Sequence, residues 1–458
     1  MMKRHRSTLI ILLICFVTSQ CQHIPETKDV IGLPAEVVES IERRIAEGLT
    51  PSIALAVIDS SGVEFFNFGK TAKNGQEVDE NTIYEIGSIT KVFTGILLAQ
   101  QVLDGELKLE DEINNYLPDD IIVPVMGDKE ITFGNLTDHT SGFPRMASNF
   151  SPSNHQNPYA DYTVDQMYEY ISNYQAVRTV GSEYEYSNLA QGLLGHLLAM
   201  NKACTYEELM VQTIADPLEM KDTRIYLTQR MNENLALGYS GGRHVENWDI
   251  PTLAGAGAIR SSTSDMANFI SANLGYLSSP LIKAMELSHQ IRHDMAGESS
   301  IAMGWHINKG NKGDIICHGG GTGGYRTFVG FVKETGKGVV LFTNSSEGAD
   351  DIGFYLLGSG SGLAKFKSDA VDIPKSTLEQ YVGLYEMRPD FFITISKEGK
   401  QLFGRATGQE RFGMFPENDT VFYLTVVEAK ISFQHEKGAV ESLTLFQGGQ
   451  EMLGKKIE

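Results

Sequence analysis

The placement of strand-forming segments at both ends of the first 345 residues restricts the fold more than any other feature of the sequence. Two runs rich in apolar and aromatic residues, 52–60 and 63–69, meet at a short turn ending in Gly62. A second pair occupies residues 328–345, while 88–300 is mostly helical in pattern. Such an arrangement is most simply accommodated by one antiparallel sheet covered by helices. We therefore expect an α/β fold of the α+β type, whose sheet is built from both ends around an inserted helical subdomain.

Helical periodicity is clearest near the start of the chain and in its middle. Apolar residues at helical spacing predict an opening helix over residues 34–48. Five further helices are predicted in the middle stretch, over 88–104, 164–174, 187–200, 204–215 and 264–274.

The pattern changes after Asn344 and predicts a second domain. Residues 358–374 begin with alternating glycine and serine, which indicates a linker. Residues 375–458 contain six to eight short apolar runs separated by tight turns, a pattern typical of a small antiparallel barrel or sandwich. The predicted organisation is a first domain over 30–357, a linker over 358–374 and an all-β domain over 375–458.

Residues 1–21 are predicted to be a cleaved export signal. A basic start precedes the apolar run Leu9–Val17, which is too short to span a bilayer. The residues that follow resemble a bacterial lipoprotein signal with Cys21 as the acylated residue, although Gln20 departs from the small residue usual there. A soluble secreted protein cut near the same point is the alternative. Both interpretations predict export, to the periplasm or cell envelope, and lipidation would anchor the chain to a membrane.

Charge and cysteine usage exclude several classes of function. A formal net charge of -20 argues against nucleic acid as a partner, because phosphate binding needs concentrated Lys and Arg. Four cysteines are too few for a disulfide scaffold. Cys204 and Cys317 are most simply two separate thiols, although a bridge between them stays open in an oxidising compartment. No histidine pair has metal-motif spacing, so we predict no metal and no cofactor. The sequence does not indicate an oligomeric state.

Ser88 and Lys91 form the most informative motif. They are three residues apart at the start of a predicted helix and therefore share one face of it. The helix N-terminus favours negative charge developing on Ser88. A serine hydroxyl becomes a good nucleophile when a base takes its proton, and a buried lysine can be that base if it is neutral. The alternative is an N-cap serine beside a solvated lysine, because Ser-x-x-Lys occurs by chance in a chain of this length.

The triplet Tyr186-Ser187-Asn188 precedes another predicted helix. A tyrosine beside a lysine and a serine can relay a proton, and an asparagine amide can hold a substrate carbonyl. Ser187 or Asn188 could equally be a simple N-cap.

A third element is the glycine-rich segment His318–Tyr325 (HGGGTGGY), which joins two strand-like runs. Glycines beside a strand allow a ligand to approach the backbone closely, and free N–H groups there can complete an oxyanion hole. A flexible turn is the alternative. A phosphate loop is not supported, because the GxxxxGK[ST] motif is absent and no helix is predicted to follow.

Together the three elements occur in the chain order of the Ser-x-x-Lys, Ser-Asp-Asn and Lys-Thr-Gly signature of β-lactamases and penicillin-binding proteins. The chain resembles the class C β-lactamase family in its broad sense, which includes D-peptidases and esterases and has Tyr-x-Asn as its second motif. The resemblance covers about residues 34–345, and the C-terminal segment resembles the lipocalin-like barrel often appended to such enzymes. Within residues 34–345, the resemblance includes the segments 131–144, 216–224, 255–269 and 339–345.

The resemblance implies roles for individual residues. Ser88 would form the acyl-enzyme, and Lys91 and Tyr186 would share proton transfer. Asn188 would position the substrate amide. The backbone N–H groups of Ser88 and Gly321 would form the oxyanion hole. The other residues implied in substrate binding are His318, Gly320, Gly321, Thr322 and Tyr325.

One departure from the family pattern bears on the substrate. His318 and Gly319 stand where the family has the lysine and threonine that hold a substrate carboxylate. Histidine is largely neutral at pH 7, and glycine has no hydroxyl. The resemblance then implies a serine hydrolase acting on amides, peptides or esters, such as a D-amino-acid peptidase, carboxypeptidase or esterase. A class C β-lactamase is one alternative, and a non-catalytic sensor of peptidoglycan fragments or lipids is another.

Two further sets of residues are predicted to be structural. His139 is expected to be a loop histidine, because no triad spacing supports a catalytic role. The pairs Asp119-Asp120 and Asp350-Asp351 are expected to be solvated turns.

Overall fold

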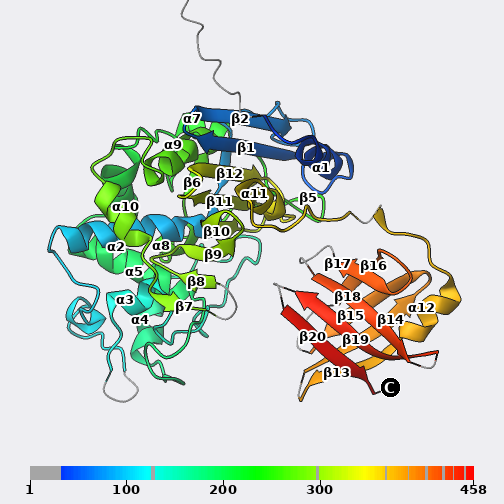
Figure 1. Cartoon of the computed structure of the whole chain (residues 1–458). Helices are drawn as coiled ribbons and strands as arrows, with labels where there is room; N and C mark the ends of the chain where they lie inside the picture. The colour runs from blue at the N-terminus through cyan, green and yellow to red at the C-terminus, as the bar shows by residue number, and fades with distance from the viewer. Residues whose placement is uncertain are drawn as a thin grey trace, which may run out of the picture.

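The computed structural model describes residues 32–457 apart from 125–128, 296–298, 367–368, 390, 408–410, 425–428, 437 and 448–449. Its main element is an antiparallel sheet with the strand order β2-β1-β12-β11-β10-β9-β8-β7 (Figure 1). The strands are β1 (Ser52–Asp59), β2 (Gly62–Gly69), β7 (His293–Asp294), β8 (Ser299–Ile301), β9 (His306–Gly310), β10 (Gly313–Gly321), β11 (Arg326–Val332) and β12 (Lys337–Thr343). Because β1 pairs with β12, with Ile53 opposite Thr343, the prediction of a sheet built from both ends is confirmed.

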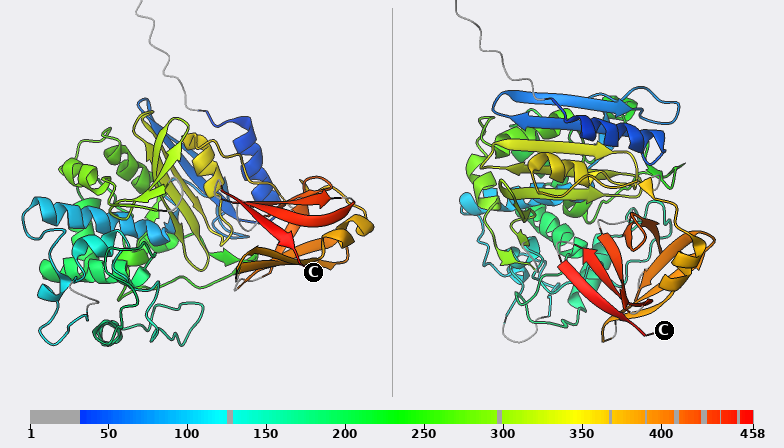
Figure 2. Two further views of the ribbon diagram at one scale, coloured as in Figure 1. Left: turned by 60° about the horizontal axis from the view of Figure 1, so that its bottom comes forward. Right: turned by 45° about the vertical axis from the view of Figure 1, so that its right-hand side comes forward.

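Side chains alternate along β1 and give the sheet two buried faces. Alternate residues from Ile53 to Val57 pack under α1 (Ala35–Ala46) and α11 (Asp350–Leu357). Those from Ala54 to Ile58 belong to the larger core beneath α2 (Thr90–Leu103) and α9 (Thr263–Asn273). Figure 2 shows these helical layers on opposite sides of the sheet.

Most helices lie between β2 and β10 in the sequence and form the inserted subdomain (Figure 1). Three begin with a threonine whose hydroxyl accepts a hydrogen bond from the backbone N–H three positions later and whose own backbone N–H donates to the side chain of that residue: Thr132, Thr163 and Thr205. The remaining helical elements are α3 (Phe133–Thr137), α4 (Val164–Ser172), α5 (Asn188–Asn201), α6 (Tyr206–Met210), α7 (Gln229–Glu233), α8 (Ala254–Gly257) and α10 (Ile282–Ser288), with the 3₁₀ turns η1 (Gly87–Ile89) and η2 (Ile113–Asn115) and the π-helical turn η3 (Val211–Ala215).

Two short two-stranded sheets complete the first domain. β3 (Ile83–Glu85) pairs antiparallel with β6 (Arg260–Ser262), so that Glu85 lies opposite Arg260. β4 (Tyr239–Ser240) pairs with β5 (Arg243–His244). The β3–β6 pair brings the residues before Ser88 beside a segment more than 170 positions later in the chain.

The C-terminal part is a closed barrel in which consecutive strands are neighbours, the up-and-down architecture that lipocalins also use. Tyr381, at the end of α12 (Lys375–Tyr381), enters the interior and stacks on Phe433 with ring centroids 4.1 Å apart. The barrel alternative is therefore confirmed over the sandwich. The strands are β13 (Gly383–Arg388), β14 (Phe391–Glu398), β15 (Gln401–Ala406), β16 (Phe412–Pro416), β17 (Val421–Leu424), β18 (Ala429–Glu436), β19 (Ala439–Gln447) and β20 (Gln450–Lys456).

The predicted linker contacts both parts of the chain. Phe366 is buried beneath the guanidinium of Arg43 from α1, 4.2 Å from its ring centroid. The carbonyl of Phe366 accepts a hydrogen bond from the hydroxyl of Tyr423 in the barrel. Asp369 forms an ion pair with Arg43 at 2.8 Å. The segment is thus held between α1 and the barrel.

The expectation for Asp350-Asp351 was wrong. They begin α11, where acidic groups favour the positive end of the helix dipole. Asp351 accepts hydrogen bonds at 2.8 Å from Arg44 of α1 through both carboxylate oxygens.

Cys204 and Cys317 are both free thiols. Residues 1–31, including Cys21, lie outside the described residues. Within the described part of the chain, no helix has the length and apolar character needed to cross a membrane.

Candidate active site

Ser88 lies in a sharp turn between β3 and α2. The 3₁₀ turn η1 precedes α2, so the α-helix begins two residues later than the sequence predicted. Gly87 has φ +52°, and a Cβ there would come within 2.7 Å of the backbone nitrogen of Gly321. The turn therefore requires glycine, and it brings Ser88 beside the end of β10.

Lys91 is directed at Ser88. Its Nζ is hydrogen-bonded to Ser88 Oγ at 3.0 Å and donates to the carbonyl of Ala256 at 2.6 Å. The side chain is fully buried, and this burial, aided by the positive charge of Arg145, holds the pKa of Lys91 well below its usual value. A neutral amine within hydrogen-bond distance of a hydroxyl can accept its proton.

The helix α5 positions the second motif. Ser187 is its N-cap and accepts a hydrogen bond from the backbone N–H of Ala190 at 2.9 Å. The capping interpretation is therefore correct for Ser187, and the residues on either side of it face Ser88. The ring centroid of Tyr186 is 4.9 Å from Lys91 Nζ. Burial raises the pKa of Tyr186 to about 12, although a hydrogen bond with Ser88 opposes this, so the phenol keeps its proton at neutral pH.

Asn188 is the first residue of α5 and is largely buried. Its Nδ2 donates to the hydroxyl of Tyr159 at 3.3 Å, and its Oδ1 has no hydrogen-bond partner in the protein. An unpaired buried amide oxygen beside a nucleophile can accept a hydrogen bond from a substrate amide N–H.

His139 packs against the catalytic tyrosine candidate. Its ring stacks on Tyr186 with centroids 4.6 Å apart, and its Nδ1 accepts a hydrogen bond from the backbone N–H of Ser187 at 3.1 Å. The residue adopts φ +60°, which is uncommon for a non-glycine residue. Burial lowers the pKa of His139 well below its usual value. His139 thus orients Tyr186, as a structural histidine next to the site.

His318 faces the site, whereas the preceding Cys317 faces α11. Its Nδ1 donates to the carbonyl of Gly319 at 2.6 Å, which leaves Nε2 unprotonated and without a partner in the protein. Its ring lies 5.0 Å from that of His306 and 6.5 Å from that of Tyr186. Burial lowers the pKa of His318 well below its usual value. The group is therefore neutral at pH 7 and cannot replace a lysine as a charged anchor.

A small hollow opens beside Ser88 and is lined by residues from five separate segments. Tyr159 and Trp248 form one wall, with ring centroids 5.3 Å apart. Asn188 and Gly321 lie on the same hollow. The backbone nitrogen of Gly321 lies beside the turn that carries Ser88, within 2.7 Å of where a Cβ on Gly87 would be, which is the neighbourhood that an oxyanion hole requires.

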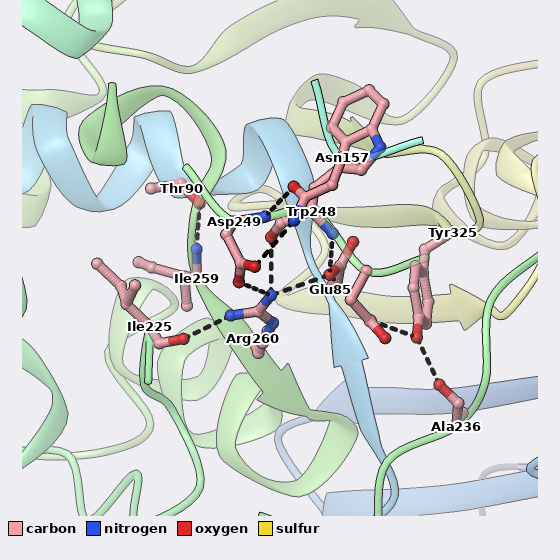
Figure 3. Close-up of polar contacts among 11 residues, drawn as sticks. Glu85, Thr90, Asn157, Ile225, Ala236, Trp248, Asp249, Ile259, Arg260 and Tyr325 are labelled. Carbon is pink, nitrogen blue, oxygen red and sulfur yellow. Dashed lines mark hydrogen bonds and ion pairs between the residues drawn. The ribbon is translucent and has the colours of Figure 1, made fainter. Parts of the chain in front are cut away.

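A buried network holds the Trp248 wall in place (Figure 3). Glu85 Oε1 accepts hydrogen bonds from the backbone N–H of Trp248 and from Asn247 Nδ2, both at 2.9 Å. Arg260 donates to the carbonyl of Trp248 at 2.7 Å and to Glu85 at 3.2 Å. Burial raises the pKa of Glu85, while the charge of Arg260 opposes the rise. The ion pair thus fixes the segment that carries Trp248 relative to the turn that carries Ser88.

Three residues that the family resemblance implied in substrate binding lie at different positions relative to the hollow. Tyr325 is 1% exposed, and its hydroxyl donates to the carbonyl of Ala236 while accepting from Asn247, so the structure does not bring it to the hollow. A Cβ on Gly320 would come within 2.0 Å of the carbonyl of Ile86, so this glycine permits close backbone packing. Thr322 lines the hollow.

Within the described residues, no three His, Cys, Asp or Glu side chains come together in a way that could hold a metal ion. The chemistry available at this site is that of its side chains and backbone. A hydroxyl, a buried amine of lowered pKa and a protonated phenol meet beside the end of β10, which defines a serine hydrolase of the Ser-Lys-Tyr type, acting through an acyl-enzyme.

Comparison with known proteins identifies the family. The sequence matches the Beta-lactamase family over residues 38–356 and a domain of unknown function (DUF3471) over residues 367–456. The chain therefore belongs to the Beta-lactamase family.

The relatives include proteins named for different activities. The chain is 27% identical to a beta-lactamase of Pseudomonas fluorescens, covering 68% of this chain and 93% of the relative. It is 27% identical to the D-alanyl-D-alanine-carboxypeptidase/endopeptidase AmpH of Escherichia coli K12, covering 77% and 97%. Among solved structures, the octameric penicillin-binding protein homologue from Pyrococcus abyssi superimposes with a TM-score of 0.66 at 21% identity, covering 92% of this chain and 99% of that one. This likeness shows the fold.

Proposed function

We propose that Ser88 is the nucleophile of this hydrolase and that its substrates are amides, peptides or esters, as in a D-amino-acid peptidase, carboxypeptidase or esterase. The observation that carries the assignment is the 3.0 Å contact between Ser88 Oγ and the buried, neutral Lys91. A lysine on a solvated helix face would have its ordinary pKa and could not take the proton at neutral pH.

In acylation, Ser88 Oγ attacks the substrate carbonyl carbon as its proton moves to Lys91 Nζ. The carbonyl oxygen becomes an oxyanion, which accepts hydrogen bonds from the backbone N–H groups of Ser88 and Gly321. Asn188 Oδ1, which lacks a partner in the protein, accepts the substrate amide N–H. These contacts fix the carbonyl above the nucleophile.

Collapse of the intermediate breaks the bond to the leaving amine or alcohol. Tyr186 donates its proton to the leaving group, and the proton now on Lys91 restores the phenol. In deacylation a water attacks the ester carbonyl, gives its proton to the same Lys91–Tyr186 pair, and Ser88 leaves with a proton returned from that pair. Both half-reactions balance without a cofactor.

The identity of residue 318 favours peptides and esters over β-lactams. The buried His318 is neutral and Gly319 has no hydroxyl. The contacts by which the lysine and threonine of the family pattern bind a β-lactam carboxylate are therefore weakened. The relative from Pseudomonas fluorescens supports the alternative, a class C β-lactamase.

Intact-mass spectrometry of the purified chain tests the assignment and the ranking together. The wild type is exposed to a cephalosporin, an acyl-D-alanyl-D-alanine peptide and a p-nitrophenyl ester, beside Ser88→Ala and the surface control Ser182→Ala. We expect an acyl adduct on wild type and Ser182→Ala and none on Ser88→Ala. Equal labelling of all three proteins contradicts the assignment, and a strong preference for the cephalosporin reverses the ranking.

We also propose that the chain is exported and anchored through a lipid on Cys21. The support is the basic start, the apolar run Leu9–Val17 and the position of Cys21 after it. Cys21→Ser should release the protein from the membrane fraction of a bacterial host, whereas a secreted protein would be soluble with either residue.

A further inference from the structure

Arg145 is an exposed arginine whose guanidinium lies beside the catalytic groups. Its Cζ is 5.0 Å from the ring centroid of Tyr186. Its backbone is fixed to the second motif, because the carbonyl of Arg145 accepts the N–H groups of Asn188 at 2.9 Å and Leu189 at 3.3 Å. The backbone from which the side chain extends is therefore fixed next to Asn188.

The other arginines around this loop are neutralised by acidic partners. Arg178 forms an ion pair with Glu185, and Arg292 forms one with Asp138 at 3.2 Å. Arg145 has no carboxylate within ion-pair distance among the residues that the structure describes, and its guanidinium packs against the ring of Tyr186. An arginine held beside a nucleophile with no counter-charge of its own is suited to binding an anionic group of the substrate.

The imidazoles nearer to Ser88 supply no competing charge. Burial keeps the pKa values of His139 and His318 well below their usual values, so both are neutral at pH 7, and it disfavours the charged form of Lys91. The chain as a whole carries a formal charge of -20, which repels anions from most of its surface. Arg145 is thus a permanent local positive charge beside Tyr186.

We propose that Arg145 binds a carboxylate of the acyl substrate, so that the enzyme selects anionic peptides, amides or esters. The proposal rests on the proposed function and names its substrate class. A guanidinium can hold a carboxylate through two parallel N–H bonds, which a point charge cannot. Arg145 then supplies, from a different loop, the positive charge that His318 no longer provides.

Matched thioesters measure this selection. One is neutral, with an N-acetylglycyl group on thioglycolamide; the second carries a carboxylate on the leaving group (thioglycolate), and the third on the acyl side (N-succinylglycyl). They are assayed with wild type, Arg145→Gln, Arg145→Lys and the control Arg178→Gln. We expect Arg145→Gln to raise KM for at least one anionic thioester about tenfold. Because the charge of Arg145 also lowers the pKa of Lys91, Arg145→Gln changes kcat for all three thioesters alike, and KM is the readout that reports on the anion site. KM should stay unchanged for the neutral thioester and for every thioester with Arg178→Gln, and Arg145→Lys should be intermediate.

Equal changes in KM for all three thioesters, or no change, would overturn the proposal. Binding to the inactive Ser88→Ala protein, measured by titration calorimetry, separates this result from a failure of the proposed function. If wild type neither turns over any thioester nor becomes acylated, the proposed function fails. Tighter binding of an anionic thioester by Ser88→Ala than by Ser88→Ala/Arg145→Gln would still support the anion site, and equal binding would overturn it.

Discussion

The active-site region and the C-terminal barrel treat buried polar groups in opposite ways. Around Ser88, His139 Nε2, Asn188 Oδ1 and His318 Nε2 are buried without partners. In the barrel, the hydroxyls of Tyr381 and Tyr385 are both paired with backbone carbonyls, at 2.6 and 2.9 Å. A buried polar atom without a partner costs about 1–3 kcal/mol. Beside Ser88 a substrate can complete such atoms, whereas others, such as Ser40 Oγ and Trp305 Nε1, lie elsewhere in the first domain. The paired tyrosines of the barrel show the packing that stability alone favours.

The same contrast bears on the sensor hypothesis. The inside of the barrel is filled by its own aromatic and aliphatic side chains, with Tyr381 stacked on Phe433 and Phe422 at the edge of the same cluster. Among the described barrel residues, this packing fills the interior that a lipid-binding barrel would leave open. The unpaired polar atoms next to Ser88 lie in the first domain, and so does the chemistry.

Replacing the buried lysine should separate function from stability most strongly. In Lys91→Met, acylation of Ser88 should fall by about 10²–10⁴-fold, because the general base is lost. The free energy of unfolding should stay constant or rise, because a buried amine without a counter-charge is costly. Stopped-flow acylation and denaturant unfolding measure the two effects, with the exposed Lys202→Met as control. Retained acylation, or a large decrease in the free energy of unfolding, would contradict the statement that Lys91 serves function and not stability.

The converse substitution lies in the barrel. Tyr381→Ala should destabilise the barrel by about 3–5 kcal/mol, as for other large aromatic side chains removed from a core. Acylation of Ser88 by a small ester should be unchanged. Calorimetry and mass labelling of the full chain report on both. Loss of acylation while the first domain is still folded would mean that the barrel supports the site directly.

Acid should weaken the first domain through its buried imidazoles. Burial lowers the pKa of His306 to about 4. Above pH 6.5 the imidazole of His306 is neutral in the folded and in the unfolded chain. Between pH 6.5 and 4 it binds a proton in the unfolded chain only, so the free energy of unfolding decreases as pH falls. The loss from His306 should be about 1–3 kcal/mol.

The comparison of wild type with His306→Asn isolates this effect from carboxylates such as Asp350, whose pKa burial raises to about 6 and which act in the opposite sense. Urea unfolding followed by tryptophan fluorescence reports on the first domain, because Trp248 and Trp305 both belong to it. Identical pH slopes in the two proteins would contradict the neutral state of His306.

The smallest effect is expected from the network below Trp248. Glu85→Gln keeps the shape of the side chain and removes the charge that Arg260 faces. KM for substrates large enough to reach Trp248 should rise by less than about tenfold, with kcat for a small ester unchanged. Asp249→Asn, which changes the exposed partner of the same guanidinium, is the matched control. An equal rise in KM, or an equal fall in kcat, for small and large substrates would mean that Glu85 acts on Ser88 itself.

Local spacing made the central residues of the site predictable. Ser88 and Lys91 lie within one turn of chain, and the Tyr186–Asn188 triplet is contiguous, so both motifs are visible without tertiary information. The sheet was predictable for a similar reason, because apolar alternation in residues 52–69 and 328–345 is a local property. Among the elements, α11 and α12 were missed because they are short and begin next to linker-like composition.

The residues that tune the site could not be found in this way. Glu85 and Arg260 are 175 positions apart and meet only because β3 pairs with β6. Tyr159 and Trp248 come from separate loops. Tyr325 was expected beside the substrate from the family resemblance, but its hydroxyl donates to the carbonyl of Ala236. Contacts of this kind depend on chain packing, which spacing does not encode.

The pH dependence of Ser88 acylation by an uncharged p-nitrophenyl ester tests the proton-accepting role of Lys91 most directly. Because burial lowers the pKa of Lys91, the acylation rate should reach its plateau well below the ordinary lysine pKa of 10.5. Lys91→Met should lack the rise that leads to this plateau. A wild-type rate that keeps rising tenfold for each pH unit up to 10.5 would show a charged lysine in the resting enzyme and would contradict the account.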